Sequence, residues 1–116
     1  MPQSWIIPAA KQPLQLVERP PAQATAQASS GQVGVQLQAA ALNHRDLWIQ
    51  LGQYAGLKYP IVPGSDGAGL LEGQPVLINP GMCWGENPAV QGKRFQILGL
   101  PEDGTFAQEV VVPREY

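Results

Sequence analysis

Residues 33–42 read VGVQLQAAAL and are followed at 43–46 by NHRD, and this passage decides how the chain folds. Apolar side chains occupy every second position from Val33 to Ala41. That period predicts a strand with one buried face. The strand ends at the polar cluster 43–46, which contains His44, the single histidine of the sequence.

A second polar segment follows at residues 60–69, PIVPGSDGAG. Its glycines match neither the P-loop spacing nor the dinucleotide-binding fingerprint, and no helical pattern follows them. We therefore predict a tight turn or bulge, in which glycine allows positive φ or close packing of strands. We expect any functional site to lie where this segment meets residues 43–46.

One short helix is predicted directly after the strand 33–42, with its apolar residues at Leu47, Trp48, Ile49 and Leu51. Asn43 is a favoured N-cap, Asp46 stands three residues later, where its carboxylate can reach back to the cap, and Gly52 suits the position after the last turn. Capping alone explains Asn43 and Asp46 without any catalytic role.

The 13 glycines and 12 prolines of this 116-residue chain disfavour long helices and favour short strands joined by turns. Further strands are expected at residues 4–8, 14–18, 75–78, 95–99 and 105–112. A mobile surface loop is expected at 22–32, an irregular excursion at 79–92 and a turn at 101–104. The predicted fold class is all-β: a single domain over residues 1–116, forming a small, partly open β-barrel with one helical turn.

Charge and cysteine content narrow the function classes. Seven basic and nine acidic residues are scattered along the chain, which argues against nucleic acid or an anionic membrane as a partner. The single cysteine, Cys83, excludes an intrachain disulfide and suits a reducing compartment. No leader and no apolar run long enough to span a bilayer is seen, so we expect a soluble cytoplasmic protein.

Three ordered segments, at residues 33–54, 59–81 and 97–113, resemble the N-terminal, GroES-like catalytic domain of the medium-chain dehydrogenase/reductase superfamily. Within that superfamily the passage around Asn43, the GSDGAG sequence and the NPG at 79–81 are most similar to quinone oxidoreductase-like and alcohol dehydrogenase-like members. The resemblance covers nearly the whole chain. It implies descent from an oxidoreductase.

The resemblance also bears on metals. Zinc-dependent members have cysteine at the place of Asn43, histidine at the place of Ser65 and glutamate at the place of Asp66. Asn43 and Ser65 are not usual zinc ligands, so no catalytic zinc is expected. A structural zinc would need four cysteines in the region 79–97, where Cys83 stands alone, and Cys83 is expected to be structural.

Metal-free members use NADPH to reduce quinones, enones or enoyl thioesters, in a cleft between this barrel and a Rossmann domain. By resemblance, Asn43 would lie near the nicotinamide and the substrate oxygen, and His44 near the ribose or pyrophosphate. Tyr54 would line the substrate cleft as a hydroxyl donor, with Trp48 as an apolar wall. Asp46 would support the helix start, and Gly64, Ser65, Asp66 and Gly69 would support the loop.

The cofactor domain of the family, with its GxGxxG fingerprint, is not found in this sequence. We therefore expect a truncated oxidoreductase that binds no cofactor alone and is inactive alone. Two functions stay open. The chain is either the catalytic-domain portion of a zinc-independent NAD(P)H-dependent oxidoreductase, or a non-catalytic barrel that oligomerises through the face a cofactor domain would cover. The substrate and the choice between NADPH and NADH also stay open.

Overall fold

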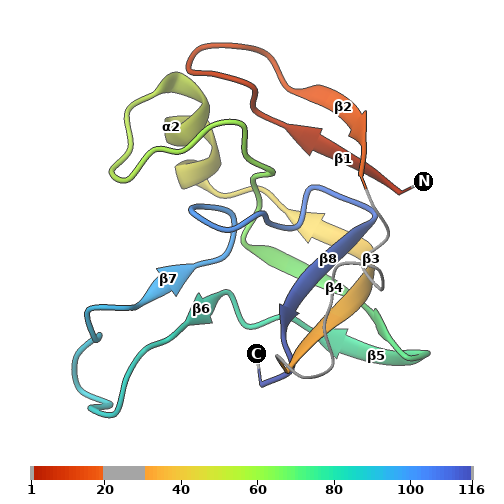
Figure 1. The fold of residues 1–116 in the computed structure, drawn as a ribbon, viewed down its shortest axis with the longest axis vertical. Coiled ribbons are helices and arrows are strands. Elements are labelled where there is room, and N and C mark those ends of the chain that lie inside the picture. The colour runs from red at the N-terminus through yellow and green to blue at the C-terminus, as the bar shows by residue number, and fades with distance from the viewer. Residues whose placement is uncertain (1, 20–30, 116) are drawn as a thin grey trace.

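The computed structural model describes residues 2–19 and 31–115 and consists mainly of strands (Figure 1). In chain order the elements are β1 (Gln3–Ile6), β2 (Gln15–Glu18), β3 (Gln32–Ala41), α2 (His44–Leu51), β4 (Asp66–Leu71), β5 (Gln74–Leu77), β6 (Gly81–Met82), β7 (Gln96–Ile97) and β8 (Glu109–Pro113). The all-β prediction, with one short helix among the described residues, is confirmed. Most of the predicted loop 22–32 lies outside the described residues.

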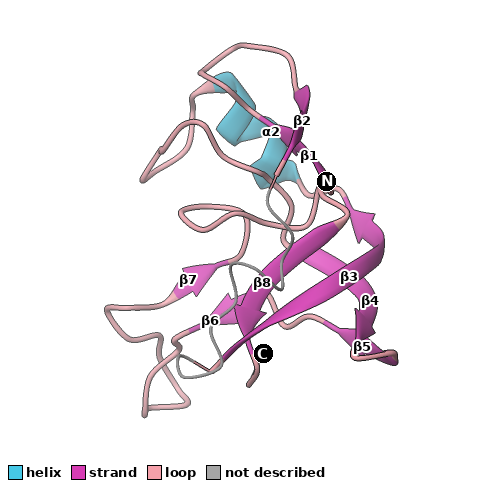
Figure 2. Ribbon diagram, turned by 45° about the vertical axis from the view of Figure 1, so that its right-hand side comes forward, coloured by secondary structure: helices cyan, strands magenta, loops and turns pink. Residues whose placement is uncertain are grey.

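The largest sheet has four antiparallel strands in the order β5-β4-β3-β8 (Figures 1 and 2). The strands expected at 4–8 and 14–18 correspond to β1 and β2, which pair as an antiparallel hairpin, and β6 pairs with β7. Isolated bridges tie the hairpin to the rest of the fold, at Ser4 with Ala107 and at Ile7 with Ile61. The first bridge places the hairpin beside residue 107, and the second places it beside the segment that precedes β4.

Two apolar clusters form the core. The larger one lies on the four-stranded sheet and contains Val33, Val35, Ile78, Met82, Leu98, Val110 and Val112. The smaller one lies under the helix and contains Ile7, Ile49, Ile61 and Leu100, with Tyr54 and Tyr59 packed against it. The helix therefore contributes a single buried apolar side chain, Ile49.

Strand β3 was predicted to have one buried face along its whole length, and this prediction is wrong for the second half of the strand. Val33 and Val35 are buried, but Ala39 and Ala41 are exposed. The reason is the length of the neighbouring strand, because β8 pairs only with Gln32–Gln36 of β3. Beyond that point β3 runs past the larger core cluster.

The prediction of a turn or bulge over residues 60–69 is wrong at its C-terminal end, where Asp66 begins β4. The explanation given for the glycines is confirmed. Gly64 has a φ of 103°. Gly69 packs so closely on β3 that a β-carbon there would stand 2.1 Å from the Gln36 carbonyl oxygen.

The two last predicted strands are shorter than expected. The strand expected at 95–99 is only Gln96–Ile97, and the one expected at 105–112 begins at Glu109. The N–H groups of Thr105 and Phe106 instead donate to the carbonyls of Gly64 and Pro63, both at 3.0 Å. Residues 105–106 thus fasten the 63–64 turn and do not extend β8.

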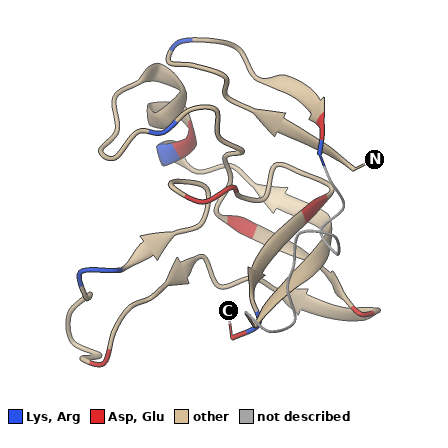
Figure 3. Ribbon diagram, viewed as in Figure 1, with Lys and Arg blue, Asp and Glu red and all other residues tan. Residues whose placement is uncertain are grey.

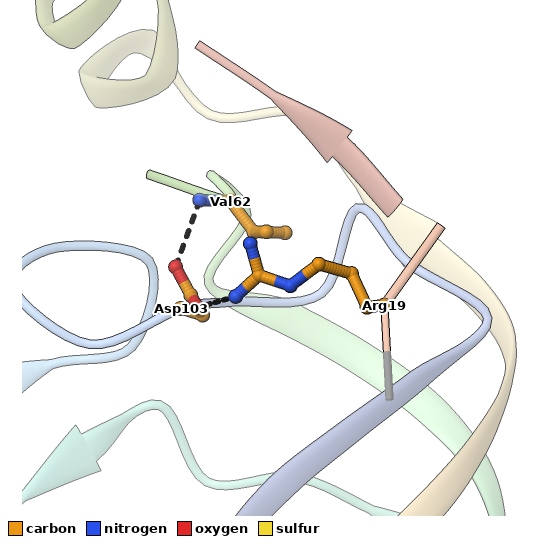
Figure 4. Close-up of polar contacts among 3 residues, drawn as sticks. All are labelled: Arg19, Val62 and Asp103. Atoms are coloured by element: carbon orange, nitrogen blue, oxygen red, sulfur yellow. Dashed lines mark hydrogen bonds and ion pairs between the residues drawn. The ribbon is translucent and has the colours of Figure 1, made fainter. Parts of the chain in front are cut away.

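Asp103 joins three segments at the predicted 101–104 turn (Figure 4). Its carboxylate pairs with Arg19 at the end of β2 and accepts the Val62 N–H at 3.0 Å. Both charged side chains are partly exposed, so the ion pair itself adds little stability. Charges elsewhere in the described chain are scattered (Figure 3). Within that part of the chain, no helix is long and apolar enough to cross a membrane.

Candidate functional site

The helix start is built as the sequence predicts. Asn43 is extended (φ −126°, ψ 154°), and its N–H donates to Oδ2 of Asp46 at 2.9 Å. Gly52 adopts the left-handed conformation (φ 76°) and donates its N–H to the Ile49 carbonyl. The capping prediction for Asn43, Asp46 and Gly52 is confirmed.

Asp46 also links the helix to the glycine-rich segment. Its second oxygen, Oδ1, accepts the N–H of Gly64 at 3.2 Å, and the residue is buried. Asp66, two residues after Gly64, accepts a hydrogen bond from the Asn43 side-chain amide at 2.8 Å. The two polar segments 43–46 and 60–69 therefore meet, as expected from the sequence.

Arg45 is the centre of this junction. One of its terminal nitrogens donates to Ser65 Oγ and to the Leu98 carbonyl, both at 3.0 Å, and the other donates to the Leu100 carbonyl at 3.3 Å. Ser65 itself is buried and donates to the same Leu98 carbonyl at 2.7 Å. Every partner in these bonds is neutral. Among the hydrogen bonds and ion pairs of the described residues, none joins the Arg45 guanidinium to a carboxylate.

Tyr54 is held by the same guanidinium. Arg45 Nε donates to the Tyr54 hydroxyl at 3.3 Å, and the guanidinium carbon lies 5.2 Å from the centre of the phenol ring. Arginine has no acceptor, so the hydroxyl oxygen must be the acceptor in this bond. The phenol hydrogen is consequently free to donate to another oxygen.

His44 and Trp48 lie one turn apart on the outer face of α2. Their ring centres are 6.5 Å apart, with the planes tilted by 39°, and both residues are exposed. Together with the exposed Asn43 they offer an amide, an imidazole and an indole to a ligand. Such groups can hydrogen-bond to sugar hydroxyls or lie against a planar ring.

Two hollows of the described chain lie elsewhere. One, of about 550 Å³, borders Arg19, Asp103 and Met82, and the other, of about 640 Å³, lies between the β1–β2 hairpin and the end of β3. Neither is lined by Asn43, Trp48 or Tyr54. The substrate cleft expected beside Trp48 and Tyr54 therefore stays a prediction.

The central role of Arg45 was missed at the sequence level, where it was only one member of the polar cluster. A signal was present, because Arg45 lies four residues before Ile49 and so shares its helical face. Four apolar residues among 47–51 obscured which face is buried. Only Ile49 of these is buried, so the face containing Arg45 points inward.

Comparison with known proteins identifies similar domains. The family described as the alcohol dehydrogenase GroES-like domain matches residues 29–116. A zinc-type alcohol dehydrogenase-like protein of Schizosaccharomyces pombe is 37% identical over 95 residues, covering 72% of this chain and 28% of that protein.

Solved structures show the same fold. The crystal structure of an NAD-dependent alcohol dehydrogenase superposes with a TM-score of 0.77 at 30% identity, covering 96% of this chain and 37% of that one. The quinone oxidoreductase of Thermus thermophilus, also solved with NADPH, gives a TM-score of 0.67 at 24% identity, with coverages of 97% and 30%. The chain thus spans roughly a third of the length of these relatives.

Proposed function

The chain belongs to the family of alcohol dehydrogenase GroES-like domains, and on this premise we propose that it is the catalytic-domain portion of a zinc-independent, NAD(P)H-dependent oxidoreductase. The substrate class we propose is a quinone, an enone or a related small carbonyl compound. The observation that carries the proposal is the bond from Arg45 to the Tyr54 hydroxyl, which leaves the phenol hydrogen for a ligand oxygen.

In such a reaction the cofactor supplies a hydride, and the protein holds the acceptor and donates hydrogen bonds where negative charge develops on oxygen. Tyr54 is the proposed proton donor to that oxygen. The unpaired positive charge of Arg45 beside it stabilises the negative charge that the proton leaves on the phenol. Asn43 keeps one amide hydrogen for a second contact, because its bond to Asp66 uses a single hydrogen, while its side chain also faces the Asp46 N–H in the capping box.

Zinc independence is supported by the chemistry of the side chains at this junction. Ser65 Oγ already accepts from Arg45 and donates to Leu98, and a neutral hydroxyl is a poor zinc ligand. The guanidinium in contact with Ser65 would repel a second cation. In the described part of the chain, no three His, Cys, Asp or Glu side chains gather closely enough to hold a metal ion.

The residues present fit only the nicotinamide end of the cofactor. Asn43 and His44 are exposed at the helix start, where they would hold the nicotinamide and its ribose. A strand–helix–strand unit with a glycine fingerprint, which would bind the pyrophosphate, does not occur in residues 2–19 and 31–115. We therefore expect the 116-residue chain to be inactive alone.

The test uses reduced nicotinamide mononucleotide, which lacks the adenosine half, and NADPH. Amide and indole resonances would be followed by NMR during titration of the isotopically labelled chain. We expect weak, millimolar binding of the mononucleotide, with shifts confined to residues 43–48 and Tyr54. NADPH is expected to show no saturable micromolar binding by nicotinamide fluorescence.

Trp48→Phe and Trp84→Phe form a matched pair, because these tryptophans are 42% and 40% exposed. The first variant should weaken mononucleotide binding and the second should leave it unchanged. Shifts centred on Trp84, or none at residues 43–48, would overturn the site assignment. Micromolar binding of NADPH would show that the expected inactivity is wrong.

A further inference from the structure

The side-chain amide of Asn43 is fixed in one orientation. Its Nδ2 donates to Oδ2 of Asp66 at 2.8 Å, and the same side chain faces the Asp46 N–H in the capping box. A carboxylate only accepts hydrogen bonds, and a backbone N–H only donates them. The amide nitrogen must therefore point to Asp66 and the amide oxygen to the Asp46 N–H, because exchanging the two atoms would break both contacts.

Asp66 is itself held in place by backbone contacts. It is the first residue of β4 and pairs with Ala41 of β3. Its carbonyl accepts a hydrogen bond from the Thr105 hydroxyl at 2.9 Å, and Thr105 is only 1% exposed. These contacts fix the backbone at Asp66, so its carboxylate is carried on a rigid element. Functional side chains are oriented most precisely by supporting groups of this kind.

The bond between Asn43 and Asp66 is not needed to hold the fold together. Both residues are exposed, so water can replace either partner at little cost in free energy. Asp46 is the contrasting case, because it is buried and joins the helix start to Gly64. The main effect of Asp66 is therefore on the direction in which the Asn43 amide points.

We propose that Asp66 is a positioning residue, which makes Asn43 a hydrogen-bond donor toward a neutral carbonyl oxygen of the ligand. One Nδ2 hydrogen is left after the bond to Asp66, while the amide oxygen is turned toward the helix start. The carboxylates of Asp46 and Asp66 both lie at Asn43, so an anionic ligand group is disfavoured there. The inference rests on the proposed function and specifies which ligand atom Asn43 contacts.

Two probes distinguish the two sources of such a carbonyl. Cyclohexenone represents the acceptor substrate, and reduced nicotinamide mononucleotide carries the carboxamide of the cofactor. Each is titrated separately into the labelled 116-residue chain, while NMR follows the two Nδ2 hydrogens of Asn43. These hydrogens give separate signals because rotation about an amide C–N bond is slow. Without ligand, we expect the hydrogen bonded to Asp66 to exchange with water about three- to tenfold more slowly than the other.

Asp66→Ala, Asp66→Asn and Glu86→Gln form the set of variants. Asp66→Ala should bring the two exchange rates within about twofold of each other, because neither hydrogen then has a carboxylate acceptor. Asp66→Asn keeps one oxygen that can accept and should preserve part of the difference. Glu86→Gln removes a negative charge from the exposed segment between β6 and β7 and should change neither rate. Urea unfolding should be nearly the same for all four chains, which a purely structural role of Asp66 does not predict.

On binding either probe, we expect a downfield shift of only the Nδ2 hydrogen that is not bonded to Asp66. Asp66→Ala should bind that probe about three- to tenfold more weakly than the wild type does. Equal exchange rates in the wild type, unchanged rates in Asp66→Ala, or a shift of the other hydrogen alone would overturn the inference. If neither probe perturbs residues 43–48 or Tyr54, the proposed function fails instead, and the exchange rates without ligand still decide whether Asp66 orients Asn43.

Discussion

Gly69 of β4 lies against the backbone of Gln36 on β3, with no room between them for a side chain. A β-carbon at position 69 would meet the Gln36 carbonyl oxygen at 2.1 Å and the Leu37 α-carbon at 2.9 Å. Because these are backbone atoms, the strands must move apart to accept it. We expect Gly69→Ala to lower the free energy of unfolding by about 2–3 kcal/mol, measured by urea titration.

Gly81→Ala is the control for that substitution. A β-carbon at Gly81 would come no closer than 3.4 Å to its nearest neighbour, the ring of Phe95. This variant should stay within about 0.5 kcal/mol of the wild type. Equal losses for the two alanines would show that β3 and β4 are not packed as closely as described.

Asp46 secures the helix start and the 63–64 turn with one carboxylate. Asp46→Ala leaves the N–H groups of Asn43 and Gly64 without their acceptor, and we expect a loss of about 2–3 kcal/mol. Asp46→Asn keeps one oxygen and should lose about half as much. Thermal and urea unfolding would measure both, with the exposed Glu86→Ala as a control expected near zero.

Arg45 cannot be replaced by lysine without loss. Its planar guanidinium donates to four acceptors in different directions, and the single ammonium group of a flexible lysine side chain cannot satisfy all of them. We expect Arg45→Lys to cost about 1–2 kcal/mol in urea unfolding, because the carbonyls of buried Leu98 and Leu100 lose donors. Arg94→Lys, at an exposed position, should be neutral, and equal effects would contradict the central role of Arg45.

Glu72 offers a stabilising substitution. It forms the two-residue turn between β4 and β5 with Gly73, and both have positive φ, 51° and 80°. Asparagine adopts this conformation more readily than glutamate and is favoured in such turns. Glu72→Asn removes the exposed ion pair with Arg114, which is worth little. We expect a net gain of about 0.5 kcal/mol.

Arg114→Gln separates the contribution of the ion pair from that of the turn conformation, because it removes the ion pair with Glu72 and leaves the turn unchanged. A change of less than about 0.5 kcal/mol is expected from this variant. If Glu72→Asn and Arg114→Gln destabilise the chain equally, the ion pair outweighs the conformation of the turn.

The sequence predicted the parts of the fold that local patterns specify. The capping residues Asn43 and Asp46, the turn glycine Gly64 and the alternation at Val33 and Val35 all express short-range chemistry, and each is found as predicted. The meeting of residues 43–46 and 60–69 was also anticipated, from two polar segments that end or interrupt strands.

The features that sequence reasoning missed depend on distant partners. Strand β4 begins at Asp66 within a passage rich in glycine, and it is a strand because β3 and β5 pair with its two edges. The exposure of Ala39 and Ala41 follows from where β8 stops, which no pattern within β3 reveals. Arg45 likewise depends on Leu98 and Leu100, more than fifty residues away.

The bonds between the two ends of the chain set an order on its folding. The Trp5 N–H donates to the Phe106 carbonyl and the Gln108 N–H to the Gln3 carbonyl, across about a hundred residues. Contacts of such long range are slow to form, because loop-closure entropy is lost before they can form. During synthesis, the β1–β2 hairpin leaves the ribosome well before residues 106–108, and its edge is satisfied only when they arrive. The hairpin is thus completed by a segment that is made much later.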